Sequence, residues 1–155
     1  MRAIIRAKMD VATRLSKAEQ CLAGAALAVR HGQYNNAANR AYYAVFQAAI
    51  AALSAAGIEP PAPRYWSHDF VLREYCRQAP DDGGRYAGSC RSTLKALQDV
   101  RLKADYETET LSRSTGQRAL ALAQEFVDAV RQRVGGEVAC PPSPSPRGRR
   151  RSSSQ

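Results

Sequence analysis

The sequence predicts an all-α fold, an antiparallel bundle of four to five helices, and three observations lead to it. Alanine is the commonest residue, with 28 copies against 27 for isoleucine, leucine, valine and phenylalanine together. Alanine is the best helix former, and its small side chain lets helices approach closely. Apolar residues recur at helical spacing in five segments separated by Gly- or Pro-containing stretches. Strand formers are sparse, and no run of about 18 apolar residues predicts a transmembrane helix.

The first two helices are predicted over residues 8–31 and 34–56. The first has an apolar stripe at spacings of three and four, formed by Val11, Leu15, Ala18, Leu22, Ala25 and Val29. In the second, a stripe of larger residues, Tyr42, Phe46, Ala49 and Leu53, adjoins a smooth alanine face. Gly32 and Gly57 are expected to end these helices, because glycine is common just past a helix C-terminus.

A proline-rich connector over residues 59–63 separates the second helix from a shorter third one, because proline cannot continue a helix. The third helix is predicted over residues 67–78, with Ser67 as its N-cap. Residues 80–84, Pro-Asp-Asp-Gly-Gly, have the composition of a loop.

The last two helices are predicted over residues 86–105 and 113–134, and the glycine pair at 135–136 is expected to end the second of them. We therefore place one helical domain over residues 1–136. Residues 137–155 are rich in Pro, Ser and Arg, cannot bury a core and are predicted to form a disordered tail. This tail is either an arm that contacts nucleic acid or a neutral extension.

The charge balance favours polyanionic partners. The net charge is +9 and the sequence pI is about 9.8. Positive charge raises the rate of encounter with polyanions such as RNA. The alternative is an ordinary solubilising charge in an arginine-rich chain.

The cysteines and the N-terminus bear on metal binding and compartment. The four cysteines are far apart, no Cys-x-x-Cys pair occurs, and His31 and His68 are the only histidines. A zinc site of standard spacing is absent, so we expect neither a metal nor a cofactor. Basic residues interrupt the apolar N-terminus, which lacks a signal-peptide core, so we expect a cytoplasmic protein that does not insert in a membrane. Either Met1 or Met9 serves as the start.

Three groups of polar residues are out of place on helices that should pack in a bundle. The first is Asn-Arg-Ala-Tyr-Tyr-Ala-Val-Phe at residues 39–46, where Arg40, Tyr43 and Gln47 place a polar stripe on an apolar helix. Arg40 either faces a ligand or pairs with an acidic residue, for which Asp105 is a candidate. Tyr42 is predicted to lie in the core with its hydroxyl bonded to a partner.

The second group is Trp-Ser-His-Asp at residues 66–69, where His68 is a general base, a phosphate contact or a cap. The third is Arg-Leu-Lys-Ala-Asp-Tyr at residues 101–106. Arg101 and Asp105 are four residues apart, in the order less favourable for an isolated helical pair, so local stabilisation does not explain them. We expect Arg101 and Tyr106 to point from neighbouring turns into one anion-sized cleft.

Together these motifs resemble the HEPN domain superfamily, and most of all its branch of small stand-alone bacterial and archaeal proteins, over roughly residues 8–134. The resemblance implies an all-α bundle that often forms a homodimer. Many HEPN proteins are metal-independent ribonucleases, and many are toxins encoded beside a minimal nucleotidyltransferase antitoxin. Their active site resembles an Arg followed four to six residues later by a His, with two copies meeting across the dimer.

This sequence departs from that pattern at Tyr106, which stands where the family has His, and no His follows Arg101. Tyrosine, with an ordinary pKa of about 10, is a poor proton shuttle at neutral pH. We therefore predict a catalytically degenerate module that binds RNA or a nucleotide in a toxin–antitoxin or defence-type system. The residues assigned to its site are Arg101, Tyr106 and His68 at the catalytic position, with Arg40, Tyr43, Lys103 and Asp105 for binding.

Two alternatives stay open. One is an active ribonuclease in which His68 replaces the missing His; the other is a helical adaptor whose motifs are buried ion pairs and dimer contacts. The resemblance also implies that a nucleotidyltransferase partner can adenylylate a tyrosine near the motif, and Tyr106 is the nearest one.

Overall fold

The computed structural model describes the backbone of residues 1–78 and 87–139 and the side chains of residues 1–78 and 91–135. Within these ranges the chain forms five helices and no strand. They are α1 (Arg2–Arg30), α2 (Tyr34–Ala55), α3 (His68–Gln78), α4 (Ala87–Tyr106) and α5 (Arg113–Ala139). The predicted all-α bundle is confirmed. The predicted loop at residues 80–84 and residues 140–155 of the predicted tail lie outside the described residues.

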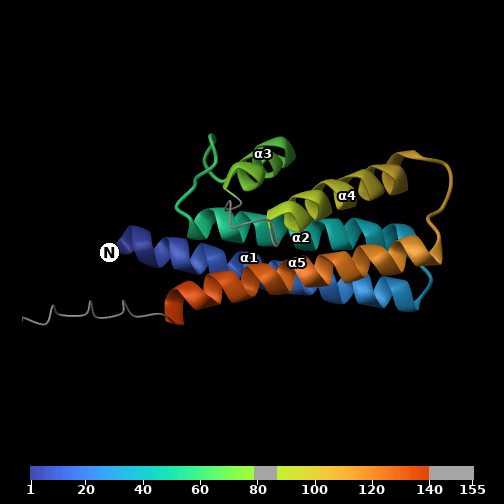
Figure 1. Cartoon of the computed structure of the whole chain (residues 1–155), viewed down its shortest axis with the longest axis horizontal. Coiled ribbons are helices and arrows are strands. Elements are labelled where there is room, and N and C mark those ends of the chain that lie inside the picture. Colours follow the sequence, from blue (N-terminus) through green and yellow to red (C-terminus); the bar gives the residue numbers. More distant parts are fainter. Residues whose placement is uncertain (79–86, 140–155) are drawn as a thin grey trace, which may run out of the picture.

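Helix α2 is the axis of the bundle. Consecutive long helices run in opposite directions, and α1 and α5 lie along α2, while α3 and α4 lie along the top of the view in Figure 1. Helix α2 contacts each of the other four helices, and its most extensive contact is with α1. No helix in the described part of the chain is long and apolar enough to cross a membrane.

Two helix ends differ from the sequence prediction. Helix α1 begins at Arg2, six residues before the predicted start, and residues 2–10 are exposed. Good helix formers such as Ala, Arg and Lys extend the helix there without packing. Helix α5 continues to Ala139 and does not stop at Gly135. A glycine inside a helix costs about 1 kcal/mol relative to alanine and does not by itself end the helix.

The turns that open and close α2 follow the predicted glycines. Gly32 and Gly57 both adopt left-handed backbone, with φ of +69° and +78°. After α1, the N–H of Gln33 donates to the carbonyl of Ala28 (2.8 Å), and after α2 the N–H of Ile58 donates to that of Leu53 (3.0 Å). Both ends therefore have the bonding of a Schellman motif, which needs a residue at positive φ.

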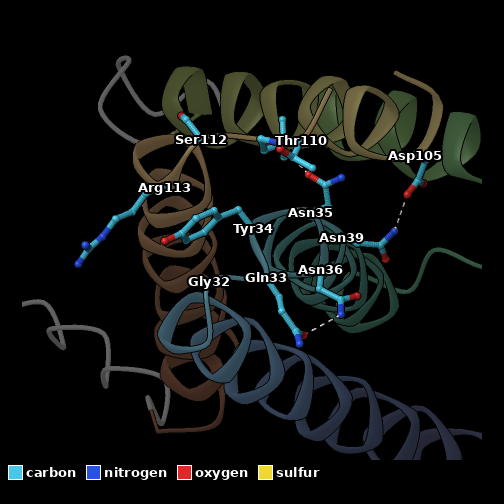
Figure 2. Close-up of a pocket in the computed structure, with 11 residues that line it drawn as sticks. Gly32, Gln33, Tyr34, Asn35, Asn36, Asn39, Asp105, Thr110, Ser112 and Arg113 are labelled. Carbon is cyan, nitrogen blue, oxygen red and sulfur yellow. Dashed lines mark hydrogen bonds between the residues drawn. The ribbon is translucent and has the colours of Figure 1, made fainter. Parts of the chain in front are cut away.

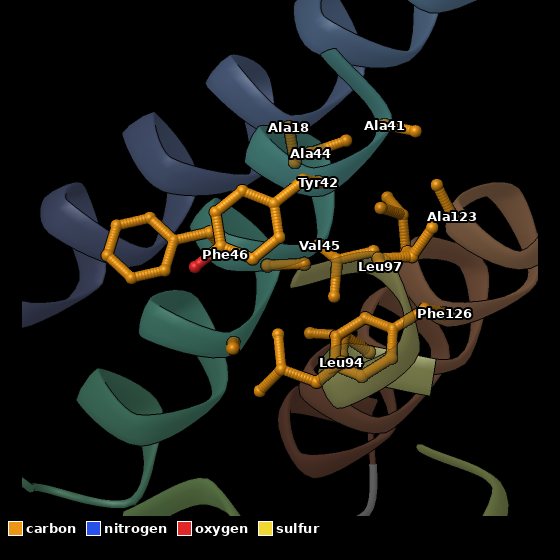
Figure 3. Packing of buried hydrophobic residues seen from close by; sticks show 14 of the residues in the cluster. Ala18, Ala41, Tyr42, Ala44, Val45, Phe46, Leu94, Leu97, Ala123 and Phe126 are labelled. Atoms are coloured by element: carbon orange, nitrogen blue, oxygen red, sulfur yellow. The ribbon is translucent and has the colours of Figure 1, made fainter. Parts of the chain in front are cut away.

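Alanine makes the close packing around α2 possible. Seven of its twelve buried residues are alanines. Figure 3 shows the small residues Ala18 of α1 and Ala44 of α2 together, and larger side chains such as Leu97 and Phe126 where α4 and α5 approach α2. The axes of packed helices are usually about 8–10 Å apart, and small side chains at the contact allow the shorter distances. Helices α3 and α4 also pack against α2, and the polar motifs at residues 66–69 and 101–106 lie at the start of α3 and the end of α4.

The contact between α5 and the first turn of α2 predicts a stability effect. A Cβ at Gly116 would lie 2.9 Å from Cδ1 and 3.1 Å from Cβ of Tyr34. We expect Gly116→Ala to lower the free energy of unfolding by about 1–3 kcal/mol, because Tyr34 cannot yield without moving the backbone. Urea denaturation monitored by circular dichroism measures the change.

Gly135→Ala is the matched control, because a Cβ there meets nothing within 4 Å inside the same helix. It should raise the free energy of unfolding by up to about 1 kcal/mol. Equal effects of the two substitutions would show that the contact with Tyr34 is unimportant.

Candidate functional site

A polar hollow of about 640 Å³ lies at one end of the bundle (Figure 2). It forms where the α1–α2 turn, the first turns of α2, the end of α4 and the α4–α5 connection meet. Its lining is mostly polar and includes Gln33, Asn35, Asn36, Asn39, Asp105, Thr110, Ser112 and Arg113.

Two asparagines on successive turns of α2 hold the end of α4 in place. The side chain of Asn35 donates to the carbonyl of Ala104 (3.4 Å) and accepts from the N–H of Leu111 (2.8 Å). Asn39 donates to Oδ1 of Asp105 over 3.0 Å, as Figure 2 shows. These bonds fix the last turn of α4, and with it Arg101, relative to α2.

Arg101 is held along its length by three neighbours. Its Nε lies 3.2 Å from Oδ2 of Asp105, and the two side chains are 18% and 31% exposed. Its guanidinium carbon lies 5.3 Å from the ring centroid of Tyr42 and 5.5 Å from that of Tyr43. These are cation–π distances, at which the aromatic rings stabilise the charge.

The three guanidinium nitrogens of Arg101 are in different states. Nε is fully buried and lacks a hydrogen-bond partner, because the carboxylate of Asp105 lies at ion-pair distance but outside hydrogen-bonding geometry. For Nη1 and Nη2, no hydrogen bond to a group in the described part of the chain is found. The outer edge of the guanidinium therefore has donors available for an anion.

His68 lies beside the same aromatic rings. Its Nδ1 is 2.5 Å from the hydroxyl oxygen of Tyr42. Its ring stacks on Phe46 at 4.6 Å between centroids and on Tyr42 at 5.5 Å, and it meets Tyr43 edge-on at 6.3 Å. The predicted core position of Tyr42 with a bonded hydroxyl is confirmed.

The start of α3 is capped by Ser67, whose Oγ accepts the N–H of Phe70 at 3.2 Å. The predicted N-cap is confirmed, and the idea that His68 serves as the cap is wrong. The serine hydroxyl satisfies the free backbone donor, which leaves the imidazole available for contacts with α2.

Burial and Arg101 set the protonation of this pair. Burial raises the pKa of Tyr42 to about 12, although the charge of Arg101 opposes the shift. Burial and, next, the charge of Arg101 lower the pKa of His68, and the neighbouring Asp69 partly offsets this. At neutral pH Tyr42 therefore keeps its proton and His68 is uncharged.

The structure brings together four of the seven residues assigned from sequence, Arg101, Asp105, Tyr43 and His68. Tyr106 is not part of this group: it is 79% exposed, whereas the Arg101 side chain is 18% exposed. Five residues along a helix correspond to about 140° around its axis, so the two side chains point to different faces. The expected joint cleft of Arg101 and Tyr106 is wrong. Lys103 is exposed, and no contact to this group is found for it.

Arg40 faces α1 and not α4. It packs against Gly24 on α1, its charge opposes the rise that burial gives to the pKa of Cys21 on the same helix, and it lines a separate hollow of about 450 Å³. The proposed pairing of Arg40 with Asp105 is wrong, because Asp105 pairs with Arg101. Adjacent residues are about 100° apart on a helix, so Asn39 faces α4 while Arg40 faces α1.

Sequence reasoning assigned no role to Asn35 and Asn39, and placed Tyr42 in the core without a role in the site. A signal for the asparagines was present. Asparagine is unfavourable inside a helix because its side chain competes for backbone hydrogen bonds. Two asparagines one turn apart in a helix therefore indicate tertiary hydrogen bonds. Among the described residues, no group of three or more His, Cys, Asp or Glu could hold a metal ion.

A comparison with protein-family models matches residues 11–133 to the HEPN domain. No curated protein matches the chain. The match covers well over half of the sequence, so the chain belongs to the HEPN domain family, as its motifs predicted. Family membership supports a nucleotide- or RNA-related module.

The lowered pKa of His68 predicts a pH dependence of stability. Below the ordinary imidazole pKa of about 6.5, the unfolded chain binds a proton that the folded chain does not, so stability falls as the pH falls. We expect the wild type to lose more stability than His68→Gln between about pH 7.5 and about pH 5.5. Urea denaturation at the two pH values measures this.

The exposed His31 supplies the control for this titration. The variant His31→Gln should show the same acid sensitivity as the wild type. If His68→Gln and the wild type lose equal stability, the imidazole of His68 does not have a lowered pKa.

Proposed function

We propose that this HEPN domain is an RNA- or nucleotide-binding module that holds a phosphate group at Arg101 and His68. The observation that carries this proposal is the state of Arg101: its inner nitrogen is buried, while its two outer nitrogens have no hydrogen-bond acceptor in the described part of the chain. A guanidinium edge of this kind matches the oxygen atoms of a phosphate. The net charge of +9 would favour the approach of RNA.

The module is proposed to be catalytically degenerate. Proton transfer by a positioned acid or base typically increases the rate by a factor of about 10²–10⁴. The acid or base must lie within hydrogen-bond reach of the reacting atoms. Tyr106, at the position where the family has His, is 79% exposed and lies on another face of α4 than Arg101. Tyr106 therefore cannot act together with Arg101 on one phosphate within a single chain.

A second candidate is a metal-independent ribonuclease in which His68 supplies the imidazole. One observation favours it: His68 and Arg101 both contact the rings of Tyr42 and Tyr43, although they lie on different helices. An experiment that measures both RNA binding and RNA cleavage distinguishes binding without cleavage from cleavage.

The test combines RNA binding and RNA cleavage by purified protein. We expect Arg101→Gln to weaken the binding of a fluorescein-labelled single-stranded RNA about tenfold or more, because the variant loses hydrogen bonds to a charged group. Fluorescence anisotropy measures the affinity, and gel electrophoresis of the same samples measures cleavage. RNA that is bound and stays intact supports the module.

Arg118→Gln is the matched control, because it removes the same charge from an exposed position on α5. It should change the affinity about twofold at most, as expected for an exposed charge that makes no contact with Arg101 or His68. Cleavage that disappears in Arg101→Gln and in His68→Gln would favour the ribonuclease. If the wild type neither binds nor cleaves RNA, the result would favour the helical adaptor.

We also propose that the protein works as a homodimer with a minimal nucleotidyltransferase partner, in a cytoplasmic toxin–antitoxin or defence-type system. The motif resemblance supports this, and so does the accessibility of Tyr106 at the end of α4. Coexpression with a nucleotidyltransferase encoded beside it should add one AMP to the chain, as measured by intact mass. Tyr106→Phe should prevent the addition, whereas Tyr65→Phe, at another exposed tyrosine, should not. An unmodified wild-type chain would contradict the proposal.

A further inference from the structure

The hydrogen bond between Tyr42 and His68 has two possible directions. Either the Tyr42 hydroxyl donates to Nδ1, or a protonated Nδ1 donates to the Tyr42 oxygen. Tyr42 is only 2% exposed, and its hydroxyl has no other partner in the described part of the chain. If Nδ1 were the donor, the hydroxyl proton of Tyr42 would be buried without an acceptor. Leaving a buried donor unpaired is strongly unfavourable, so Tyr42 donates and Nδ1 accepts.

We infer that Tyr42 is a positioning residue that holds His68 as the neutral tautomer with its proton on Nε2. In a neutral imidazole one nitrogen accepts and the other donates, so the acceptance of a hydrogen bond at Nδ1 places the proton on Nε2. His68 is partly exposed, and its Nε2 has no partner among the described residues. The nitrogen that remains available to a ligand is therefore a hydrogen-bond donor.

This tautomer determines which chemistry the site can perform. A phosphate oxygen at Arg101 would receive one further N–H donor from His68 without the cost of a second buried positive charge. A general base needs a free lone pair, and the lone pair of His68 is bound to a buried hydroxyl on α2. His68 therefore donates to a phosphate and does not remove the proton of a 2′-hydroxyl. The inference deepens the proposed phosphate-binding function and rests on it for the identity of the ligand.

The surroundings of His68 agree with a neutral ring. Arg101 on α4 disfavours a second positive charge, and the rings of Tyr42, Tyr43 and Phe46 on α2 provide an apolar contact surface. Asp69 on α3 is the acidic residue that acts in the opposite sense.

The first test is the tautomer itself, in the free protein. The chain has two histidines, so His31→Gln leaves His68 as the only imidazole signal. A long-range ¹H–¹⁵N correlation spectrum at neutral pH should show a protonated Nε2 and an unprotonated Nδ1. A protonated Nδ1, an imidazolium or an equal mixture of tautomers would overturn the inference.

Tyr42→Phe in the same background should abolish the preference for the Nε2–H tautomer, because it removes one hydroxyl and keeps the ring volume. Tyr43→Phe is the matched control on the adjacent residue and should leave the spectrum of His68 unchanged. A tautomer preference that survives Tyr42→Phe would show that Tyr42 does not position the ring. Far-UV circular dichroism confirms that each variant is folded.

The second test is rescue by a neutral donor, with the fluorescein-labelled RNA as probe. His68→Leu should weaken RNA binding about tenfold, as expected for the loss of one hydrogen bond to a charged group. His68→Gln should bind within about threefold of the wild type, because the glutamine amide donates but cannot act as a base or carry a charge. Equal losses in the two variants, or no loss in His68→Leu, would overturn the donor role.

The two tests separate this inference from the proposed function. RNA binding that depends on Arg101, with the wrong tautomer at His68, contradicts the inference alone. The Nε2–H tautomer in a protein that does not bind RNA contradicts the proposed function and the donor role, and leaves the positioning by Tyr42 intact.

Discussion

The contact of Arg101 with the rings of Tyr42 and Tyr43 is the interaction on which the site depends. It joins the last turns of α4 to the middle of α2, and the guanidinium also forms an ion pair with Asp105. A charge at 18% exposure is costly unless neighbouring groups compensate it. Aromatic faces and one carboxylate do so while leaving the outer nitrogens without an acceptor in the described residues. The inner part of the Arg101 side chain is thus held in place, while its outer nitrogens are the donors proposed to meet a ligand.

The alanine-rich helix α2 provides the platform for this contact. Seven of its twelve buried residues are alanines, so α1 packs closely against one side of α2. The tyrosines on its other side then meet α3 and α4, which supply His68 and Arg101. Polar side chains of this layer are hydrogen-bonded across helices, as Asn39 is to Asp105. Such bonds specify one register of α4 on α2.

The fold was largely predictable, and the site only in part. Repeated apolar spacing and glycine punctuation located all five helices, because these signals are local. The errors have local causes too: the predicted stop at Gly135 treated a tolerated helical glycine as an end signal. Arg101, His68, Tyr43 and Asp105, which the structure places together, were singled out because polar residues on a packed helix are unusual. Tyr106 was assigned to the site because it follows Arg101 closely, and Arg40 because it belongs to the polar stripe of α2, although their positions around the helix axes point them elsewhere.

The amino-acid sequence by itself determined the helices, the caps at Ser67, Gly32 and Gly57, and the membership of the HEPN family, because each of these depends on residues close together in the chain or on their pattern. Only the tertiary structure decided which polar groups meet. His68 and Tyr42 are 26 residues apart and joined by one hydrogen bond. Which nitrogen of an imidazole is engaged depends on the angle and depth at which two helices pack. That geometry arises from the whole core and is not encoded in either motif alone.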